Sequence, residues 1–215
     1  MTPRLVLFDL DGTLVDAYQA IHESSNHILR TFDKEEIDYD TARRSVGKGI
    51  KAYMQTLIGS DEWEKAAEIY TTHHLKALSS VVLQPGAMEL LLFLKQKGLF
   101  LAVASNRPSK SGLRILELLT IHSFFQKTLF GDQITHPKPN PEIILELIRF
   151  FQCKKEETLF IGDMPIDGET GNNAGVRTFL LPTGSSSLEE ITLSRPEKIF
   201  TSLVECLGFI KERFF

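Results

Sequence analysis

The chain has 215 residues, 42% of them hydrophobic and 24% charged, proportions that are typical of a folded globular protein and not of a disordered one. Its net charge of -4 excludes a broad basic surface, so we expect neither nucleic acid nor an anionic membrane as a partner. No apolar run approaches the roughly 20 residues of a membrane span. The short segment before residue 5 leaves no room for a signal peptide, and we therefore expect a cytoplasmic protein.

The first predicted element is a buried strand that ends in acidic residues. Residues 5–8 form an uninterrupted apolar run, which is typical of a strand covered on both faces. Asp9, Asp11, Gly12 and Thr13 follow at its carboxyl end. Ligands of parallel α/β sheets bind beyond this end of the strands, and glycine lets backbone N–H groups approach an anion. We therefore expect the chemistry of the protein at this position.

A helical block comes next. Apolar residues recur at helical intervals in three segments: 17–32, 40–57 and 61–78. At least three helices therefore precede the second convincing strand. This order predicts a helical cap domain over residues 17–82, inserted into a core domain made of residues 1–16 and 83–215.

Strands and helices alternate after residue 86, which predicts βαβ units and a parallel sheet. The expected helices are 87–97, 111–119, 141–151 and 203–214. The expected strands are 99–104, 127–130 and 158–161, with 177–181 and 198–200 as edge strands. Residues 184–187, which read GSSS, are expected to form a surface loop.

Four segments of the chain together resemble one enzyme family. Residues 9–16 read DLDGTLVD, residues 103–106 read VASN, residues 136–142 read HPKPNPE and residues 161–167 read IGDMPID. In this order and at these separations they resemble the four motifs of the haloacid dehalogenase superfamily, specifically of its phosphatase branch. The resemblance spans nearly the whole chain. It implies an α/β fold with a Rossmann-like parallel sheet, whose first strand is central, and a helical cap that closes over the site.

The resemblance assigns three catalytic residues. Asp9 would be the nucleophile, because a carboxylate can accept a phosphoryl group and so split hydrolysis into two easier steps. Asp11 would protonate the leaving oxygen and then deprotonate the attacking water, a role that disfavours carbon–halogen and phosphonate cleavage. Lys138, which lies between two prolines, would stabilise negative charge on the phosphate and on Asp9.

Four further residues are expected to bind the phosphate. Gly12 brings backbone N–H groups close to the anion, and Thr13 supports the same loop and positions Asp11. The hydroxyl of Ser105 and the backbone N–H of Asn106 would hold phosphate oxygens at the end of their strand.

A Mg²⁺ ion is the cofactor that the resemblance implies. Its ligands would be the carboxylates of Asp9 and Asp163 and the backbone carbonyl of Asp11, all hard oxygen donors. Asp167 is expected either to support these ligands or to act as an alternative ligand. Gly168 stands where the family more commonly has an apolar residue, which leaves both roles of Asp167 open.

The predicted cap contains one basic stretch, RRSVGKGI at residues 43–50. Its two glycines around a lysine resemble the cap loop of phosphoglycolate phosphatase-like members. Lys48 or Arg43 would then contact an anionic tail of the substrate, and a solvated basic turn is the alternative. His73 and His74 show no metal-ligand spacing and are expected at the surface.

We therefore expect Mg²⁺-dependent hydrolysis of a small phosphomonoester, for which 2-phosphoglycolate is a candidate, so that the partner is a small phosphorylated metabolite. Two alternatives remain open. A phosphosugar mutase of the β-phosphoglucomutase type would use the same core and return the phosphoryl group to another hydroxyl, and a binding protein would keep the fold without turnover. The sequence does not fix the oligomeric state.

Overall fold

A six-stranded parallel sheet forms the centre of the computed structural model, which describes all residues from 1 to 215. The strand order is β5-β4-β1-β6-β7-β8, and all neighbouring pairs are parallel. The strands are β1 (Leu5–Phe8), β4 (Phe100–Ser105), β5 (Lys127–Phe130), β6 (Thr158–Gly162), β7 (Arg177–Leu180) and β8 (Lys198–Ile199). The first strand is fully buried and lies between β4 and β6, so its predicted central position is confirmed.

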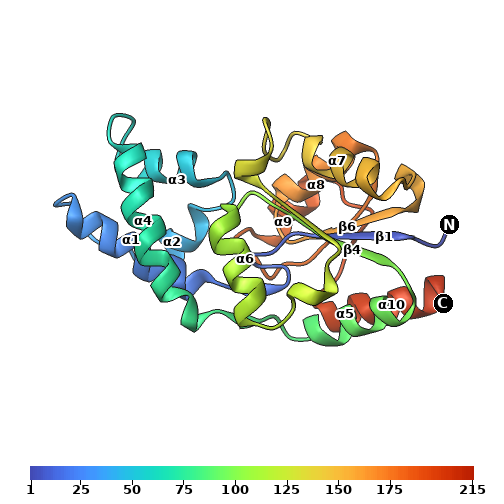
Figure 1. The fold of residues 1–215 in the computed structure, drawn as a ribbon. Helices are drawn as coiled ribbons and strands as arrows, with labels where there is room; N and C mark the ends of the chain where they lie inside the picture. Colours follow the sequence, from blue (N-terminus) through green and yellow to red (C-terminus); the bar gives the residue numbers. More distant parts are fainter.

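Helices cover both faces of this sheet (Figure 1). One face carries α5 (Ala87–Gln96), α6 (Ser109–Leu118) and α10 (Leu203–Phe214), whose apolar side chains pack with Val6 and Phe8 of β1. The other face carries α7 (Glu142–Phe151) and α8 (Pro165–Ala174), which pack with Leu5 and Leu7. Alternate residues of β1 thus face opposite layers, which is why its sequence is continuously apolar.

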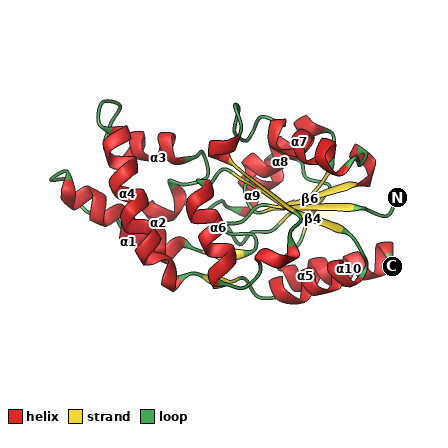
Figure 2. Cartoon of the chain, viewed as in Figure 1, coloured by secondary structure: helices red, strands yellow, loops and turns green.

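Residues 17–81, which we call the helical insert, leave the sheet after β1. The insert contains α1 (Tyr18–Thr31), α2 (Tyr39–Arg44), α3 (Ile50–Leu57) and α4 (Trp63–Ala77). Its two ends lie beside β2 (Val15–Asp16) and β3 (Val82–Leu83), which pair antiparallel with each other. Figure 2 shows the four helices gathered at one end of the sheet. The insert falls within the cap predicted over residues 17–82, and its separate domain status stays a prediction.

Short elements complete the chain. They are α9 (Leu188–Leu193) and the 3₁₀ turns η1 (Leu78–Ser80), η2 (His122–Phe124), η3 (Gly131–Gln133) and η4 (Lys155–Glu157). No helix combines the length and the apolar character that a membrane crossing requires. The cytoplasmic location stays a prediction.

Two expectations from the sequence need correction. The strand β7 is not an edge strand, because it pairs with β6 on one side and with the two-residue strand β8 on the other. The single apolar pattern over residues 40–57 covers two helices, α2 and α3. Gly47 and Gly49 separate them, with φ values of 109° and 86° that a continuing right-handed helix does not allow.

Candidate active site

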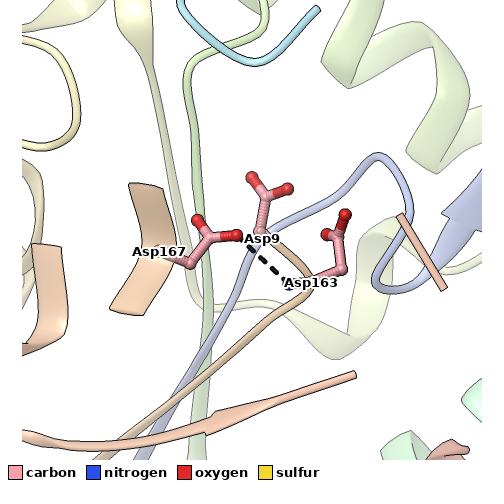
Figure 3. Close-up of side chains that lie close together, drawn as sticks. All are labelled: Asp9, Asp163 and Asp167. Carbon is pink, nitrogen blue, oxygen red and sulfur yellow. Dashed lines mark hydrogen bonds between the residues drawn. The ribbon is translucent and has the colours of Figure 1, made fainter. Parts of the chain in front are cut away.

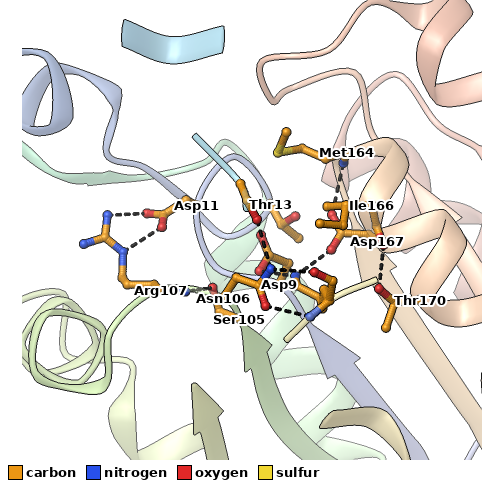
Figure 4. Close-up of polar contacts among 12 residues, drawn as sticks. Asp9, Asp11, Thr13, Ser105, Asn106, Arg107, Met164, Ile166, Asp167 and Thr170 are labelled. Atoms are coloured by element: carbon orange, nitrogen blue, oxygen red, sulfur yellow. Dashed lines mark hydrogen bonds and ion pairs between the residues drawn. The ribbon is translucent and has the colours of Figure 1, made fainter. Parts of the chain in front are cut away.

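Lys138 and two carboxylates form the centre of the site at the carboxyl end of the sheet. Figure 4 shows the two carboxylates, which belong to Asp9 and Asp167. The Lys138 Nζ donates to Asp9 Oδ1 at 2.8 Å and to Asp167 Oδ1 at 2.6 Å. Burial lowers the pKa of Lys138, but the two carboxylates outweigh it, so the net pKa of the ammonium is raised. Lys138 therefore stays charged beside the expected nucleophile.

Three buried carboxylates lie close enough together to share a cation. Asp9, Asp163 and Asp167 each offer an oxygen within 4.8 Å of the others (Figure 3). Burial raises the pKa of Asp9 to about 6, an effect that Lys138 opposes and Asp167 increases. Burial also raises the pKa of Asp163, and the neighbouring carboxylates add to the shift. Three carboxylates thus share the single ammonium of Lys138, and burial disfavours their full ionisation.

One fully buried oxygen of this cluster has no hydrogen-bond partner. Asp163 Oδ1 accepts from Thr13 Oγ1 at 2.5 Å, whereas the buried Asp163 Oδ2 accepts from no group of the chain. An orphaned buried carboxylate oxygen beside two further carboxylates fits a hard divalent cation such as Mg²⁺. Gly12 and Gly184 enclose the same oxygen. A Cβ at Gly12 would lie 2.3 Å from it, and a Cβ at Gly184 would lie 1.8 Å from it. Residues 184–187, which we expected to form a surface loop, therefore begin with the buried Gly184 at the site.

Asp167 makes supporting contacts on both of its oxygens. Its Oδ1 binds Lys138, and its Oδ2 accepts from the backbone N–H groups of Asp163 and Met164 at 3.1 and 3.0 Å. The second set of contacts closes the turn before α8, as a side-chain acceptor does at a helix start. Asp167 thus fixes both Lys138 and the Asp163 turn, and its role as a metal ligand stays a prediction.

The expected phosphate-binding residues lie around this cluster. Thr13 is fully buried and contacts Asp163, not Asp11 as we expected, because the turn at Gly12 directs its hydroxyl toward the end of β6. Ser105 lies at the end of β4 and lines the cleft described below. Its hydroxyl accepts from the backbone N–H of Arg107 at 3.4 Å.

Asn106 joins three parts of the molecule. Its Oδ1 accepts from the backbone N–H of Lys138 at 2.9 Å, and its Nδ2 donates to the backbone oxygen of the same residue at 3.1 Å. The Nδ2 also donates to the backbone oxygen of Gly47 in the helical insert at 3.0 Å. Asn106 therefore positions the Lys138 loop and connects it to the insert.

A cleft separates the acidic cluster from the helical insert. The core lines it with Asp9, Asp11, Ser105, Asn106, Arg107, Pro108, Ser111, Lys138, Met164, Ile166 and Asp167. The insert lines it with Tyr18, Ile21, Val46, Gly47, Gly49, Ile50, Tyr53, Tyr70, Thr71 and His74. The two predicted basic residues of the insert are not among them.

Lys48 and Arg43 lie elsewhere. Lys48 is exposed. The Arg43 guanidinium donates to the backbone oxygens of Thr183 and Gly184, and it lies 5.1 Å from the centre of the Tyr18 ring. Arg43 thus joins the insert to the loop after β7. Contact of Lys48 or Arg43 with a substrate stays a prediction, and neither residue lines the cleft.

The sequence analysis missed Arg107. Its Nε and Nη2 donate to the two oxygens of Asp11 at 2.6 and 2.8 Å, and its Nη1 donates to His74 Nε2 at 2.8 Å. Only its position directly after Ser105 and Asn106 could have indicated a role. Arg107 is 8% exposed and connects the expected general acid to the insert.

The expectation that His74 lies at the surface is wrong. His74 is 2% exposed, because it lies on the face of α4 that packs against α1. Burial, together with Arg107, lowers the pKa of His74 to about 3. The imidazole is therefore neutral at physiological pH and accepts a hydrogen bond from Arg107.

Comparisons with known proteins agree with this geometry. The model of a family described as haloacid dehalogenase-like hydrolase matches residues 6–181. A phosphoglycolate phosphatase of Aquifex aeolicus is 31% identical over 203 residues, covering 91% of this chain and 94% of that protein. One of Vibrio parahaemolyticus is 31% identical over 218 residues, covering 96% of each chain. A crystal structure described as a predicted phosphoglycolate phosphatase from Haemophilus somnus superimposes with a TM-score of 0.92, at 26% identity, covering 97% of this chain and 98% of that one.

Proposed function

The chain belongs to the haloacid dehalogenase-like hydrolases, and within that family we propose that it is a Mg²⁺-dependent phosphatase of small phosphomonoesters, with 2-phosphoglycolate as the leading substrate. Similar proteins that carry the name phosphoglycolate phosphatase support the substrate. The observation that carries the reaction is the Asp9 carboxylate, which ends the central strand, lines the cleft and binds the ammonium of Lys138.

Asp9 performs the first step as a nucleophile. A bond forms between its carboxylate oxygen and phosphorus, the bond from phosphorus to the ester oxygen breaks, and Asp11 gives its proton to the leaving oxygen. Lys138 stabilises the negative charge that develops on the phosphoryl oxygens. The product of this step is an aspartyl-phosphate on Asp9 and a free alcohol.

Asp11 performs the second step as a base. It takes a proton from a water molecule whose oxygen bonds to phosphorus, and the bond between phosphorus and Asp9 breaks. The step releases inorganic phosphate and restores both carboxyl groups to their starting states. The helical insert covers the cleft and limits the access of other water molecules.

The carboxylates of Asp9 and Asp163 and the backbone carbonyl of Asp11 would hold the metal ion. When bound, Mg²⁺ neutralises the negative charge of the phosphate and of the acidic cluster, so that two anions can approach each other. The orphaned Asp163 Oδ2 supports this assignment.

A phosphate-release assay over a panel of organic phosphates, with Mg²⁺ and with a chelator, tests the function. We expect release from 2-phosphoglycolate with Mg²⁺ only, and a loss of about 10⁴-fold or more in Asp9→Asn, as for removal of other nucleophiles. The exposed Asp61→Asn serves as the matched control. Wild-type rates in Asp9→Asn would contradict the proposal, and isomerisation of glucose 1-phosphate without phosphate release would favour the mutase.

A further inference from the structure

The cleft contains two cationic side chains, Lys138 and Arg107. Lys138 already binds two buried carboxylates, and its place beside Asp9 assigns it to the transferred phosphate. The insert contributes no cation to the lining, since Lys48 is exposed and Arg43 binds backbone oxygens of the core. Arg107 is therefore the cation that a second anionic group of a substrate would meet.

The guanidinium of Arg107 has two separate attachments. Its Nε and Nη2 edge holds both oxygens of Asp11, whose side chain is 19% exposed. Its Nη1 donates to His74 Nε2. Because the attachments use different nitrogens, the contact with His74 keeps Arg107 in place even when its other edge changes partner.

The contact with His74 is itself fixed by neighbouring groups. The Ser24 hydroxyl donates to the backbone oxygen of Ala20 at 2.7 Å, so its oxygen can accept from His74 Nδ1 at 3.0 Å. This arrangement leaves His74 Nε2 as an acceptor for Arg107. The Tyr70 ring stacks on the imidazole, with 5.0 Å between the ring centres, and fixes the orientation of the imidazole plane. The insert thus orients Arg107 independently of Asp11.

The pair with Arg107 fixes the Asp11 side chain. Both of its oxygens accept from the guanidinium, so the side chain is held at Arg107 while the pair lasts. A carboxylate on a substrate has the same planar geometry as the Asp11 side chain and can form the same bidentate contact. Binding of such a substrate would put its carboxylate in the place of the Asp11 carboxylate, so that the guanidinium keeps a bidentate partner.

We propose that Arg107 selects phosphomonoesters that carry a carboxylate close to the ester oxygen, and that this carboxylate displaces Asp11 from the Nε and Nη2 edge of the guanidinium. The released Asp11 carboxylate takes up a proton from solvent and is then free to give it to the leaving oxygen. A correct substrate thereby frees the acid that acts on it. This inference rests on the phosphatase function proposed above and names the substrate class of that site.

The first experiment compares two esters in Arg107→Gln. The esters are 2-phosphoglycolate and 2-hydroxyethyl phosphate, in which a neutral hydroxymethyl group replaces the carboxylate. We expect kcat/KM for 2-phosphoglycolate to fall by about 100-fold, as for other lost charge pairs, and kcat for the neutral ester to rise several-fold because Asp11 is no longer held. Lys110→Gln removes an exposed charge at the start of α6 and is the matched control. A purely structural role of Arg107 predicts equal losses for both esters, which would overturn the inference.

The second experiment supplies the carboxylate separately. Formate added to the wild-type enzyme should increase the hydrolysis of methyl phosphate several-fold and reach saturation, because formate occupies Arg107 and frees Asp11. The increase should be absent in Arg107→Gln and present in Lys110→Gln. Inhibition or no effect of formate in the wild type would overturn the displacement of Asp11.

A binding measurement separates failure of this inference from failure of the proposed function. We expect glycolate to bind the wild-type protein in calorimetry and to bind Arg107→Gln at least tenfold more weakly, about 1.4 kcal/mol. If no ester is hydrolysed, the phosphatase function fails, while such a loss of glycolate binding still supports Arg107 as the carboxylate site. Equal binding of glycolate to both proteins overturns the inference whatever the hydrolysis assays show.

Discussion

The two sides of the cleft differ in chemistry. The core side carries charged groups that hold one another, Asp9 with Lys138 and Asp11 with Arg107. The insert side carries aliphatic, aromatic and glycine residues and one threonine, and its one imidazole, His74, is neutral. The core therefore supplies the groups that break and form bonds to phosphorus, and the insert shapes the space and positions Arg107. Changes to the acidic cluster and Lys138 should affect every ester, whereas changes to Arg107 should affect the selection of esters and changes in the insert should affect closure.

Asp163→Asn tests the core side and should have the largest effect of the three changes that follow. The change removes a carboxylate ligand from the buried cluster. Loss of a group that only supports the ligands typically lowers metal affinity by about 10–100-fold. We therefore expect the loss of this carboxylate to lower Mg²⁺ affinity by about 100-fold or more. At limiting Mg²⁺, kcat/KM should fall equally for anionic and neutral esters.

Thermal unfolding gives a second measurement on the same variant. Mg²⁺ should raise the Tm of the wild type, because an ion bound only to the folded state stabilises it. The Tm of Asp163→Asn should respond much less, and that of the exposed control Asp61→Asn should respond fully. An unchanged response in Asp163→Asn would place the ion elsewhere.

Gly47→Ala tests how the insert is seated on the core. The φ of Gly47 is 109°, and a Cβ there would lie 2.8 Å from the Cε of Met164, which lines the cleft. Gly59→Ala is the matched control, because its φ is 115° but nothing lies within 4 Å of its Cβ. Both changes should cost about 1–3 kcal/mol of stability through backbone strain.

Only Gly47→Ala should also change the kinetics. If about 1.4 kcal/mol of the destabilisation by Gly47→Ala applies to the arrangement in which the insert is closed on the core, kcat/KM should drop about tenfold. Gly59→Ala should keep the wild-type kcat/KM. Equal kinetics in the two variants would show that the contact between Gly47 and Met164 has no part in closure.

His74→Gln should have the smallest effect, on the pH dependence of stability. The pKa of His74 is about 3 in the folded chain against 6.5 for an ordinary histidine. Below pH 6.5 the unfolded chain binds a proton that the folded chain excludes, so the free energy of unfolding decreases as the pH falls from 6.5 toward 3. The loss from this group between pH 7 and pH 5 is about 2 kcal/mol.

Denaturant unfolding at these two pH values measures the effect. His74→Gln should lose about 2 kcal/mol less than the wild type between pH 7 and pH 5. His122→Gln, at an exposed position, should behave like the wild type. If His74→Gln shows the full wild-type loss, the imidazole is not held neutral at the insert.

The sequence predicted the core side better than the insert side for a physical reason. Asp9, Ser105 and Asp163 each lie at the carboxyl end of a strand in the sheet, and parallel strands bring these ends together whatever the connections do. The contact between Arg107 and His74 depends on how the insert folds back over the core, which periodicity does not encode. For the same reason, basic residues in the insert suggested an anion site, whereas Lys48 and Arg43 do not line the cleft and Arg107 does.

Detailed contacts within the core also went beyond the sequence. Thr13 binds Asp163, and Gly184 packs against the same carboxylate from a stretch that its composition assigned to the surface. Composition describes the average environment of a loop. It does not show that Gly184 packs against the buried Oδ2 of Asp163.

The most direct test is to trap the phosphoryl group on the enzyme. Wild-type protein is mixed with Mg²⁺ and 2-phosphoglycolate, quenched in acid within the first turnover, digested and analysed by mass spectrometry. We expect one phosphoryl group on the peptide that contains Asp9, lost on mild alkaline treatment, and none in Asp9→Asn. Complete turnover with no phosphoryl group on the protein, or with the group on another residue, would contradict nucleophilic catalysis by Asp9.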